Sequence, residues 1–243
     1  MSGHATDPFF LAVGFHKPHP FWGLPQRFHD MYKNKIPLPT HLKSPEGMPN
    51  VAYYSCHSVD GTDDMNGTYC DTKVNPFGEC QHITEGKPLT IPVIQNIRDG
   101  YAGGITWTDQ QIGKILDKID DLGLTNDTIV MLVGDHGWSL GEHGMFCKQA
   151  NFEMHTRVPF GIKVPWLKES AGKSTGELVE LVDIYPTLAE LAGIPVDFEK
   201  HALEGVSLAK LFIDQQAKVK DAAFSQYPRC LNSTTSQWAP FSD

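Results

Sequence analysis

The chain has 243 residues, of which 40% are hydrophobic, so it can bury a core and is not a disordered tail. Its formal net charge of −9 argues against nucleic acid or an anionic membrane surface as the main partner, because both bind clustered Lys and Arg. No apolar run approaches the roughly 20 residues that a membrane-spanning helix needs, which predicts that the chain does not insert into a membrane.

The first elements come before a long loop. Residues 8–15 are apolar on both faces, which predicts a strand buried in a parallel sheet. Pro25 is expected to open a short helix that reaches Met31. A segment rich in Pro, Gly, Asn and Cys then occupies residues 33–88 and is expected to be a long loop.

The next two elements lead to a polar segment. Residues 91–122 carry apolar side chains at helical spacing, and Gly123 follows as a stop signal. Residues 128–133 are mostly β-branched and apolar, which predicts a second buried strand. This strand ends in Gly-Asp-His-Gly, so the polar pair Asp135 and His136 is expected at the carboxyl end of a strand.

Three more elements are expected towards the end of the chain: a strand at 160–164, a helix at 178–191 that stops at Gly193, and a last strand at 222–226. Strands that alternate with helices predict an α/β fold with a mostly parallel sheet. In such folds ligands bind beyond the carboxyl ends of the strands.

Asp135 and His136 are the first candidates for chemistry. An isolated Asp-His pair more often caps a turn than binds a ligand. Here, however, polar groups and four glycines are concentrated in residues 134–144, and glycine lets the backbone turn and lets a ligand come close. Lys148 follows four residues later. This context favours a binding site.

The segment 134–144 resembles the Asp-His-Gly segment of the sulfatases of the alkaline-phosphatase superfamily, which supplies metal ligands after a central strand. Further segments are similar to a member of that family that acts on glycosaminoglycans: 10–19, 151–152, 158–159, 178–182 and 225–229. The resemblance covers nearly all of the chain except the loop at 33–88. It implies an alkaline-phosphatase-like α/β sandwich with a mostly parallel central sheet, and places residues 1–243 in the sulfatase catalytic domain.

The resemblance also implies a role for four residues. Asp135 and His136 would be ligands of a divalent cation, which is Ca²⁺ in the family, although an imidazole ligand suits zinc better than a hard ion. Lys148 would contact the sulfate group and stabilise charge on its oxygens. His19 would face the scissile ester and donate a proton or a hydrogen bond to the leaving oxygen.

Each of these residues also has a structural interpretation. Lys148 taken alone is typical of a solvated surface lysine, and His19 between two prolines could simply order a turn. Five neighbouring residues are assigned no catalytic role, because they could equally shape a pocket or form ion pairs: His16, Lys17, Trp138, His143 and Arg157.

The sequence departs from the family at the nucleophile. Sulfatases use a formylglycine made from the Cys of a Cys-x-Pro-Ser-Arg motif, and no cysteine of this chain has that surrounding. The paired aspartates that open the family's metal site are missing too, since Asp63 and Asp64 lie in the long loop. We therefore expect the chain to begin partway through the catalytic domain, with the formylglycine in an upstream segment. Most of the family's smaller carboxyl-terminal subdomain is expected to be absent, and the chain alone to be inactive.

Two features indicate the secretory route. Three of the five cysteines crowd into the long loop, which favours a disulfide. Asn-x-Ser/Thr glycosylation acceptors occur at Asn66, Asn126 and Asn232. A lysosomal or secreted protein is therefore expected.

The resemblance implies a sulfuric ester hydrolase that removes the 2-sulfate of iduronate in heparan and dermatan sulfate, so the expected partner is a sulfated glycosaminoglycan. Two alternatives stay open. The first is another sulfatase or a phosphoesterase of the same superfamily, and the second is a protein that binds sulfated glycans without catalysis. The sequence predicts no oligomeric state.

Overall fold

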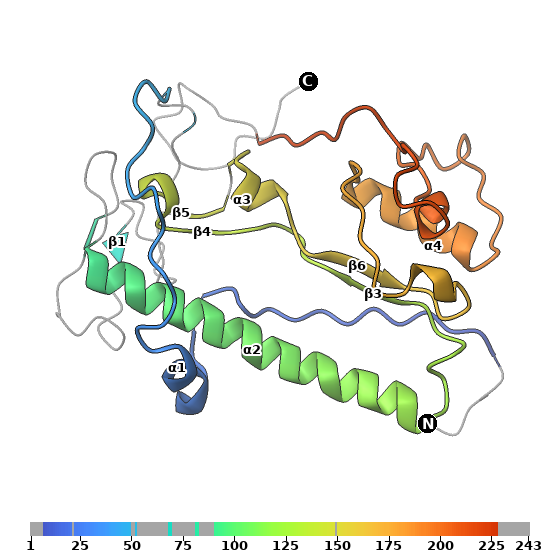
Figure 1. Ribbon diagram of the computed structural model, residues 1–243, viewed down its shortest axis with the longest axis horizontal. Coiled ribbons are helices and arrows are strands. Elements are labelled where there is room, and N and C mark those ends of the chain that lie inside the picture. Colours follow the sequence, from blue (N-terminus) through green and yellow to red (C-terminus); the bar gives the residue numbers. More distant parts are fainter. Residues whose placement is uncertain are drawn as a thin grey trace. The chain divides into compact units, whose positions relative to one another are not determined.

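The structure is a computed structural model that describes residues 7–20, 22–49, 52, 68–69, 81–82, 90–148 and 150–227. The chain forms two compact units. Unit 1 comprises residues 1–43, 56–115 and 140–144, and unit 2 comprises residues 44–55, 116–139 and 145–243. The long helix α2 (Ile91–Asp121) contributes to both units (Figure 1).

Unit 1 contains residues 91–115 of α2. The short helix α1 (Gln26–Tyr32) follows Pro25, as predicted, and its Phe28 is buried. A Cβ atom at Gly103 of α2 would lie 3.0 Å from the carbonyl oxygen of Phe28, so this glycine lets the two helices approach closely. Trp22 packs against Gly100 in the same way and completes this apolar core.

Helix α2 matches the helix predicted for residues 91–122, and it ends as predicted. Gly123 has a φ of +69°, a left-handed conformation that only glycine adopts without strain. Leu124 N–H donates to the carbonyl of Ile119 at 3.0 Å, which is a helix-terminating hydrogen bond. The chain then turns back towards the next strand.

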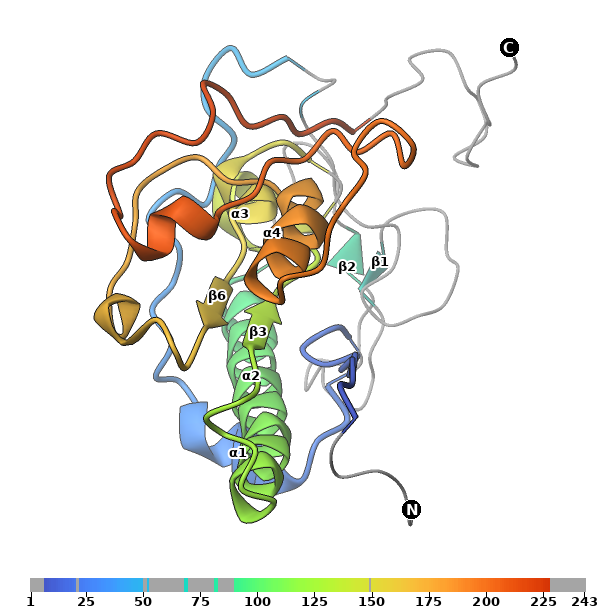
Figure 2. The same ribbon diagram turned by 90° about the vertical axis from the view of Figure 1, so that its right-hand side faces the viewer.

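Unit 2 contains a two-stranded sheet of β3 (Val130–Val133) and β6 (Phe160–Lys163), which lie side by side in both views (Figures 1 and 2). Both strands were predicted, but they are antiparallel, with Val130 opposite Lys163 and Val133 opposite Phe160. The mostly parallel pairing expected from the sequence is therefore not what these two strands show. Leu132 is 51% exposed, so β3 is not buried on both faces either.

The helix expected at 178–191 is shorter than predicted. It consists of a 3₁₀ turn at Leu181–Asp183 and the α-helix α4 (Ile184–Leu191), and Gly193 follows at a φ of +70°. Glu180 has an extended backbone, and its N–H donates to Asp183 Oδ2 at 2.8 Å in a capping interaction. The helical segment therefore starts at residue 181, three residues later than the apolar pattern predicts.

Two predicted strands are wrong. Residues 8–15 have no ladder partner among the described residues, and Phe10 and Leu11 are exposed. Residues 222–226 are also not a strand, because the N–H of Phe224 donates to the carboxylate of Glu180 instead of to a neighbouring strand. An apolar pattern predicts burial, whereas a strand also needs a partner for its backbone.

The remaining elements are short. The loop expected at 33–88 falls largely outside the described residues, which include from it the antiparallel pair β1 (Thr68–Tyr69) and β2 (Gln81–His82). Another two-stranded sheet joins β4 (Ser139–Leu140) and β5 (Phe146–Cys147). Helix α3 (Glu153–Thr156) precedes β6, and 3₁₀ turns occur at 142–144, 168–170 and 209–212. None of the helices in the described part of the chain has the length and apolarity to cross a membrane.

Candidate functional site

The turn after β3 is joined to the segment around α3 by backbone hydrogen bonds. Gly134 N–H donates to the carbonyl of Pro159 at 3.0 Å, and Gly137 N–H donates to the carbonyl of His155 at 2.8 Å. A Cβ atom at Gly137 would lie only 1.9 Å from the carbonyl oxygen of Met154, so no side chain fits there. The two residues between these glycines, Asp135 and His136, are thereby held in place.

A buried pair of side chains adds a second connection between the same segments. Ser139 Oγ lies 2.8 Å from His155 Nε2, and both residues are buried. No local sequence pattern indicates this contact, because its partners are 16 residues apart and belong to different elements. Like the Gly137 contact, it fixes the chain beside Asp135 and His136.

Three of the residues predicted to form the site lie together in unit 2. His136 Nδ1 lies 2.9 Å from the carbonyl oxygen of Gly137, and His136 Nε2 lies 2.9 Å from the ammonium of Lys148. Asp135 Oδ2 is 3.4 Å from His136 Nε2, while Asp135 Oδ1 accepts the N–H of His136 at 3.0 Å. Asp135, His136 and Lys148 therefore form one cluster, with the carboxylate of Asp135 exposed.

Trp138 lies beside this cluster. The ammonium of Lys148 is 5.7 Å from the centre of the Trp138 ring, within the range of a cation–π interaction. The rings of His136 and Trp138 are 6.2 Å apart. Trp138, to which the sequence assigned no role, is thus an aromatic neighbour of both His136 and Lys148.

The residues of the cluster fit part of a cation site. A separation of 3.4 Å between Asp135 Oδ2 and His136 Nε2 suits two ligands that are roughly at right angles around a cation at about 2.4 Å from each. No group of three or more His, Cys, Asp or Glu residues within the described ranges could hold a metal ion. Since Ca²⁺ takes six or more ligands, which include backbone carbonyls and waters, Asp135 and His136 would supply only part of its coordination.

His19 lies in unit 1 and forms a basic cluster of its own. Its ring stacks on His16 with centres 4.6 Å apart, and its Nδ1 lies 2.6 Å from the carbonyl oxygen of Pro20. Lys17 lies between the two histidines, and burial lowers the pKa of its ammonium. The catalytic role of His19 stays a prediction.

Of the residues that predict the secretory route, the structure describes Cys147 and Asn126. Cys147 is buried and disulfide-bonded, and the other four cysteines lie outside the described residues. Asn126 is exposed in the turn after α2, as a glycosylation acceptor must be. Asn66 and Asn232 are outside the described residues.

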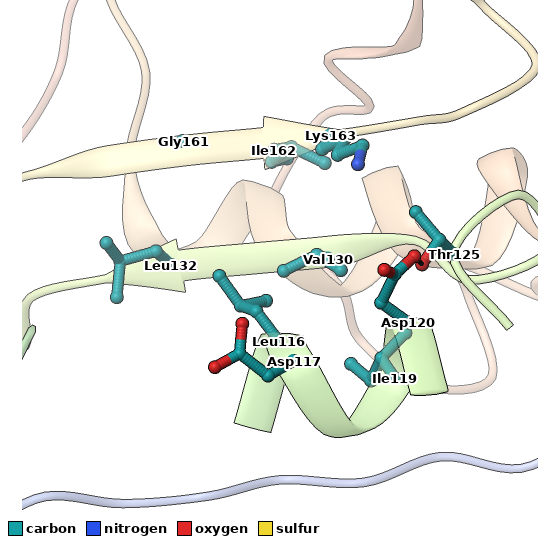
Figure 3. Close-up of a pocket in the computed structure, with 10 residues that line it drawn as sticks. All are labelled: Leu116, Asp117, Ile119, Asp120, Thr125, Val130, Leu132, Gly161, Ile162 and Lys163. Carbon is teal, nitrogen blue, oxygen red and sulfur yellow. Dashed lines mark hydrogen bonds between the residues drawn. The ribbon is translucent and has the colours of Figure 1, made fainter. Parts of the chain in front are cut away.

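Unit 2 also has an open groove of about 610 Å³ between the end of α2 and the sheet of β3 and β6 (Figure 3). Leu116, Val130 and Leu132 give it an apolar lining, and the carboxylate of Asp120 accepts a hydrogen bond from Thr125 there. None of the residues predicted for the site lines this groove.

Two solved structures resemble the fold of this chain. A protein solved in complex with its substrate D-glucosamine-2-N,6-O-disulfate matches with a TM-score of 0.65 and 20% identity, over 88% of this chain and 50% of that chain. The phosphonate monoester hydrolase of Agrobacterium radiobacter matches with a TM-score of 0.63 and 22% identity, over 86% of this chain and 39% of that chain. At these identities the likeness shows the fold alone, which is of the α/β class.

The sulfatase family model matches residues 2–194, so the chain belongs to the sulfatase family. It is 34% identical to mouse iduronate 2-sulfatase over 218 residues, which cover 79% of this chain and 37% of the mouse protein. It is 31% identical to human iduronate 2-sulfatase, with 96% of this chain and 48% of the human protein covered. The chain thus spans less than half the length of these relatives.

Proposed function

We propose that this chain supplies part of the active site of a sulfuric ester hydrolase that resembles iduronate 2-sulfatase and removes the 2-O-sulfate of iduronate in heparan and dermatan sulfate. The observation that carries the proposal is the cluster in which Asp135 and His136, on the hydrogen-bonded turn after β3, lie beside Lys148. The similarity to two mammalian iduronate 2-sulfatases supports the choice of substrate.

Each residue of the cluster has a chemical task in this proposal. Asp135 and His136 hold a divalent cation, which supplies positive charge to polarise a sulfate ester. The ammonium of Lys148 binds the sulfuryl oxygens and stabilises the charge that develops on them. His19 donates a proton or a hydrogen bond to the departing sugar oxygen.

The chain alone is proposed to be inactive. The sequence has no Cys-x-Pro-Ser-Arg motif, so the formylglycine of the family would come from a preceding segment of a longer polypeptide. We infer a mostly parallel central sheet for that complete catalytic domain, to which residues 1–243 belong. The cation is proposed to be Ca²⁺, and the compartment to be the lysosome or the extracellular space.

A second candidate function is hydrolysis of another ester by the same site. Zebrafish arylsulfatase K is 30% identical over 96% of this chain, which is close to the value for human iduronate 2-sulfatase. A multifunctional alkaline-phosphatase-superfamily protein of Trinickia caryophylli is 28% identical. A non-catalytic role in binding sulfated glycans is the third candidate, and retention of the whole Asp135, His136 and Lys148 cluster weighs against it.

The experiment that separates these candidates is a substrate comparison with the protein purified from its source. The substrates are a 2-O-sulfated iduronide, a 6-O-sulfated glucosaminide and a phosphonate monoester. The proposal predicts turnover of the first substrate alone. Turnover of either other substrate would favour a different member of the family, and glycan binding without turnover would favour the non-catalytic role.

A further inference from the structure

Lys148 occupies the only lone pair that the His136 ring can offer. The carbonyl oxygen of Gly137, 2.9 Å from His136 Nδ1, can only accept a hydrogen bond, so Nδ1 carries the ring proton. His136 Nε2 then presents its lone pair to the ammonium of Lys148, which can only donate, at 2.9 Å. One lone pair cannot bind an ammonium and a metal ion at the same time.

Asp135 lies where a cation bound to that lone pair would find its second ligand. Its Oδ2 is 3.4 Å from His136 Nε2, and its side chain is 87% exposed. The hydrogen bond from the His136 N–H to Oδ1 leaves Oδ2 facing the ring. Any cation shared by Asp135 and His136 therefore meets the Lys148 ammonium at Nε2.

We propose that a divalent cation and Lys148 exclude each other at His136, so that cation binding displaces the Lys148 ammonium from Nε2. This inference rests on the proposed roles of Asp135 and His136 as cation ligands. It adds that Lys148 has two positions, one on His136 and one released towards an anionic ligand such as a sulfate ester.

The surroundings of Lys148 suit such a movement. Cys147, the residue before it, is buried and disulfide-bonded, so the backbone is held and the flexible lysine side chain can move alone. The Trp138 ring already lies 5.7 Å from the ammonium in its position on His136, so an aromatic face is beside the charge when the lysine moves. Cation occupancy and anion binding by Lys148 would thereby be coupled, each strengthening the other.

The test is a Ca²⁺ titration of the protein expressed from its natural transcript, monitored by calorimetry and by the ¹⁵N resonance of His136 Nε2. The variants are Lys148→Met, Asp135→Ala and, as a matched control, Lys173→Met, which removes an exposed lysine of the same unit. Displacement predicts that Lys148→Met tightens Ca²⁺ binding by about tenfold, because the competing ammonium is gone. Lys173→Met should bind as the natural chain does.

The Nε2 resonance separates displacement from simple charge repulsion. Without Ca²⁺ the natural chain and Lys148→Met should differ, since only one has the hydrogen bond, and at saturation they should coincide. If Ca²⁺ binds in an Asp135-dependent way but the saturated resonances still differ, or Lys148→Met binds no more tightly, displacement is wrong and the cation site stands. If no Asp135-dependent binding occurs even in Lys148→Met, the cation site itself is wrong and the inference falls with it.

Discussion

At the scale of single residues, the candidate site depends on contacts that hold one turn. Gly137 passes so close to Met154 that its missing side chain is a steric requirement, and Ser139 and His155 join the same segments through a buried hydrogen bond. Asp135 and His136, the proposed cation ligands, lie between these contacts and β3. Their geometry is therefore set by neighbours that take no part in chemistry.

Replacing Gly137 by alanine should destabilise unit 2. A Cβ atom 1.9 Å from the Met154 carbonyl oxygen forces the backbone apart, at a cost of about 2–4 kcal/mol in the free energy of unfolding. Urea denaturation followed by circular dichroism measures this. Gly161→Ala is the matched control, because no atom lies within 4 Å of its added Cβ, and equal stability of the two variants would refute the steric argument.

Replacing Ser139 by alanine should remove the hydrogen bond to buried His155. The cost should be about 1–3 kcal/mol, because a buried polar partner then loses its contact. Ser174→Ala, at an exposed serine, should leave the unfolding free energy unchanged. A Ser139→Ala chain as stable as the Ser174→Ala chain would show that the contact contributes nothing.

At the scale of elements, the sequence predicted those that depend on local signals. Helix α1 begins directly after Pro25, and helix α2 ends just before Gly123. Strands β3 and β6 lie within the residue ranges predicted for them. Asp135, His136 and Lys148, which the resemblance to the sulfatases assigned to one site, lie together, and their roles stay a prediction. The predicted strand at 222–226 was wrong because a distant carboxylate binds its backbone.

That carboxylate belongs to a charge cluster that no local pattern indicated. The ammonium of Lys220 lies 2.6 Å from Glu180 and 2.7 Å from the fully buried Asp183, across 40 and 37 residues. Hydrogen bonds from Lys220 and from the N–H of Phe224 lower the pKa of Glu180. Burial alone would lower the pKa of Lys220, but its bonds to Asp183 and Glu180 outweigh burial and raise it.

Replacing Lys220 by methionine should therefore cost about 3 kcal/mol at neutral pH, because it removes the cationic partner of the buried Asp183 side chain. The lowered pKa of Glu180 means that its contribution is complete above its ordinary value of 4.5 and is lost as pH falls through the lowered value. The raised pKa of Lys220 means that its contribution is complete below 10.5 and is lost only above that pH.

Urea denaturation of the natural chain and of Lys220→Met at several pH values measures this dependence. The difference in stability should be constant from pH 5 to pH 8 and should shrink at pH values well below the ordinary pKa of 4.5. Lys173→Met serves as the control for loss of an exposed positive charge. A Lys220→Met difference that vanishes at neutral pH would contradict the stabilising role of the cluster.

At the scale of the whole molecule, the chain belongs to the sulfatase family and spans 37% and 48% of the two iduronate 2-sulfatases it matches. Its described residues hold Asp135, His136 and Lys148 in one cluster, and its sequence has no formylglycine motif. We propose that the activity requires a polypeptide that adds the nucleophile and further cation ligands to this cluster. That division of the active site is the central claim.

The most direct test is sulfate release from a 2-O-sulfated iduronide by the protein expressed from its natural transcript, with the intact mass and amino-terminal sequence determined on the same sample. The account predicts that a product containing an upstream Cys-x-Pro-Ser-Arg segment hydrolyses the ester, and that Asp135→Ala and Lys148→Met each lower kcat/KM by at least about 100-fold while Lys173→Met does not. Full activity in Asp135→Ala or Lys148→Met, or hydrolysis by a product that begins at Met1, would contradict it.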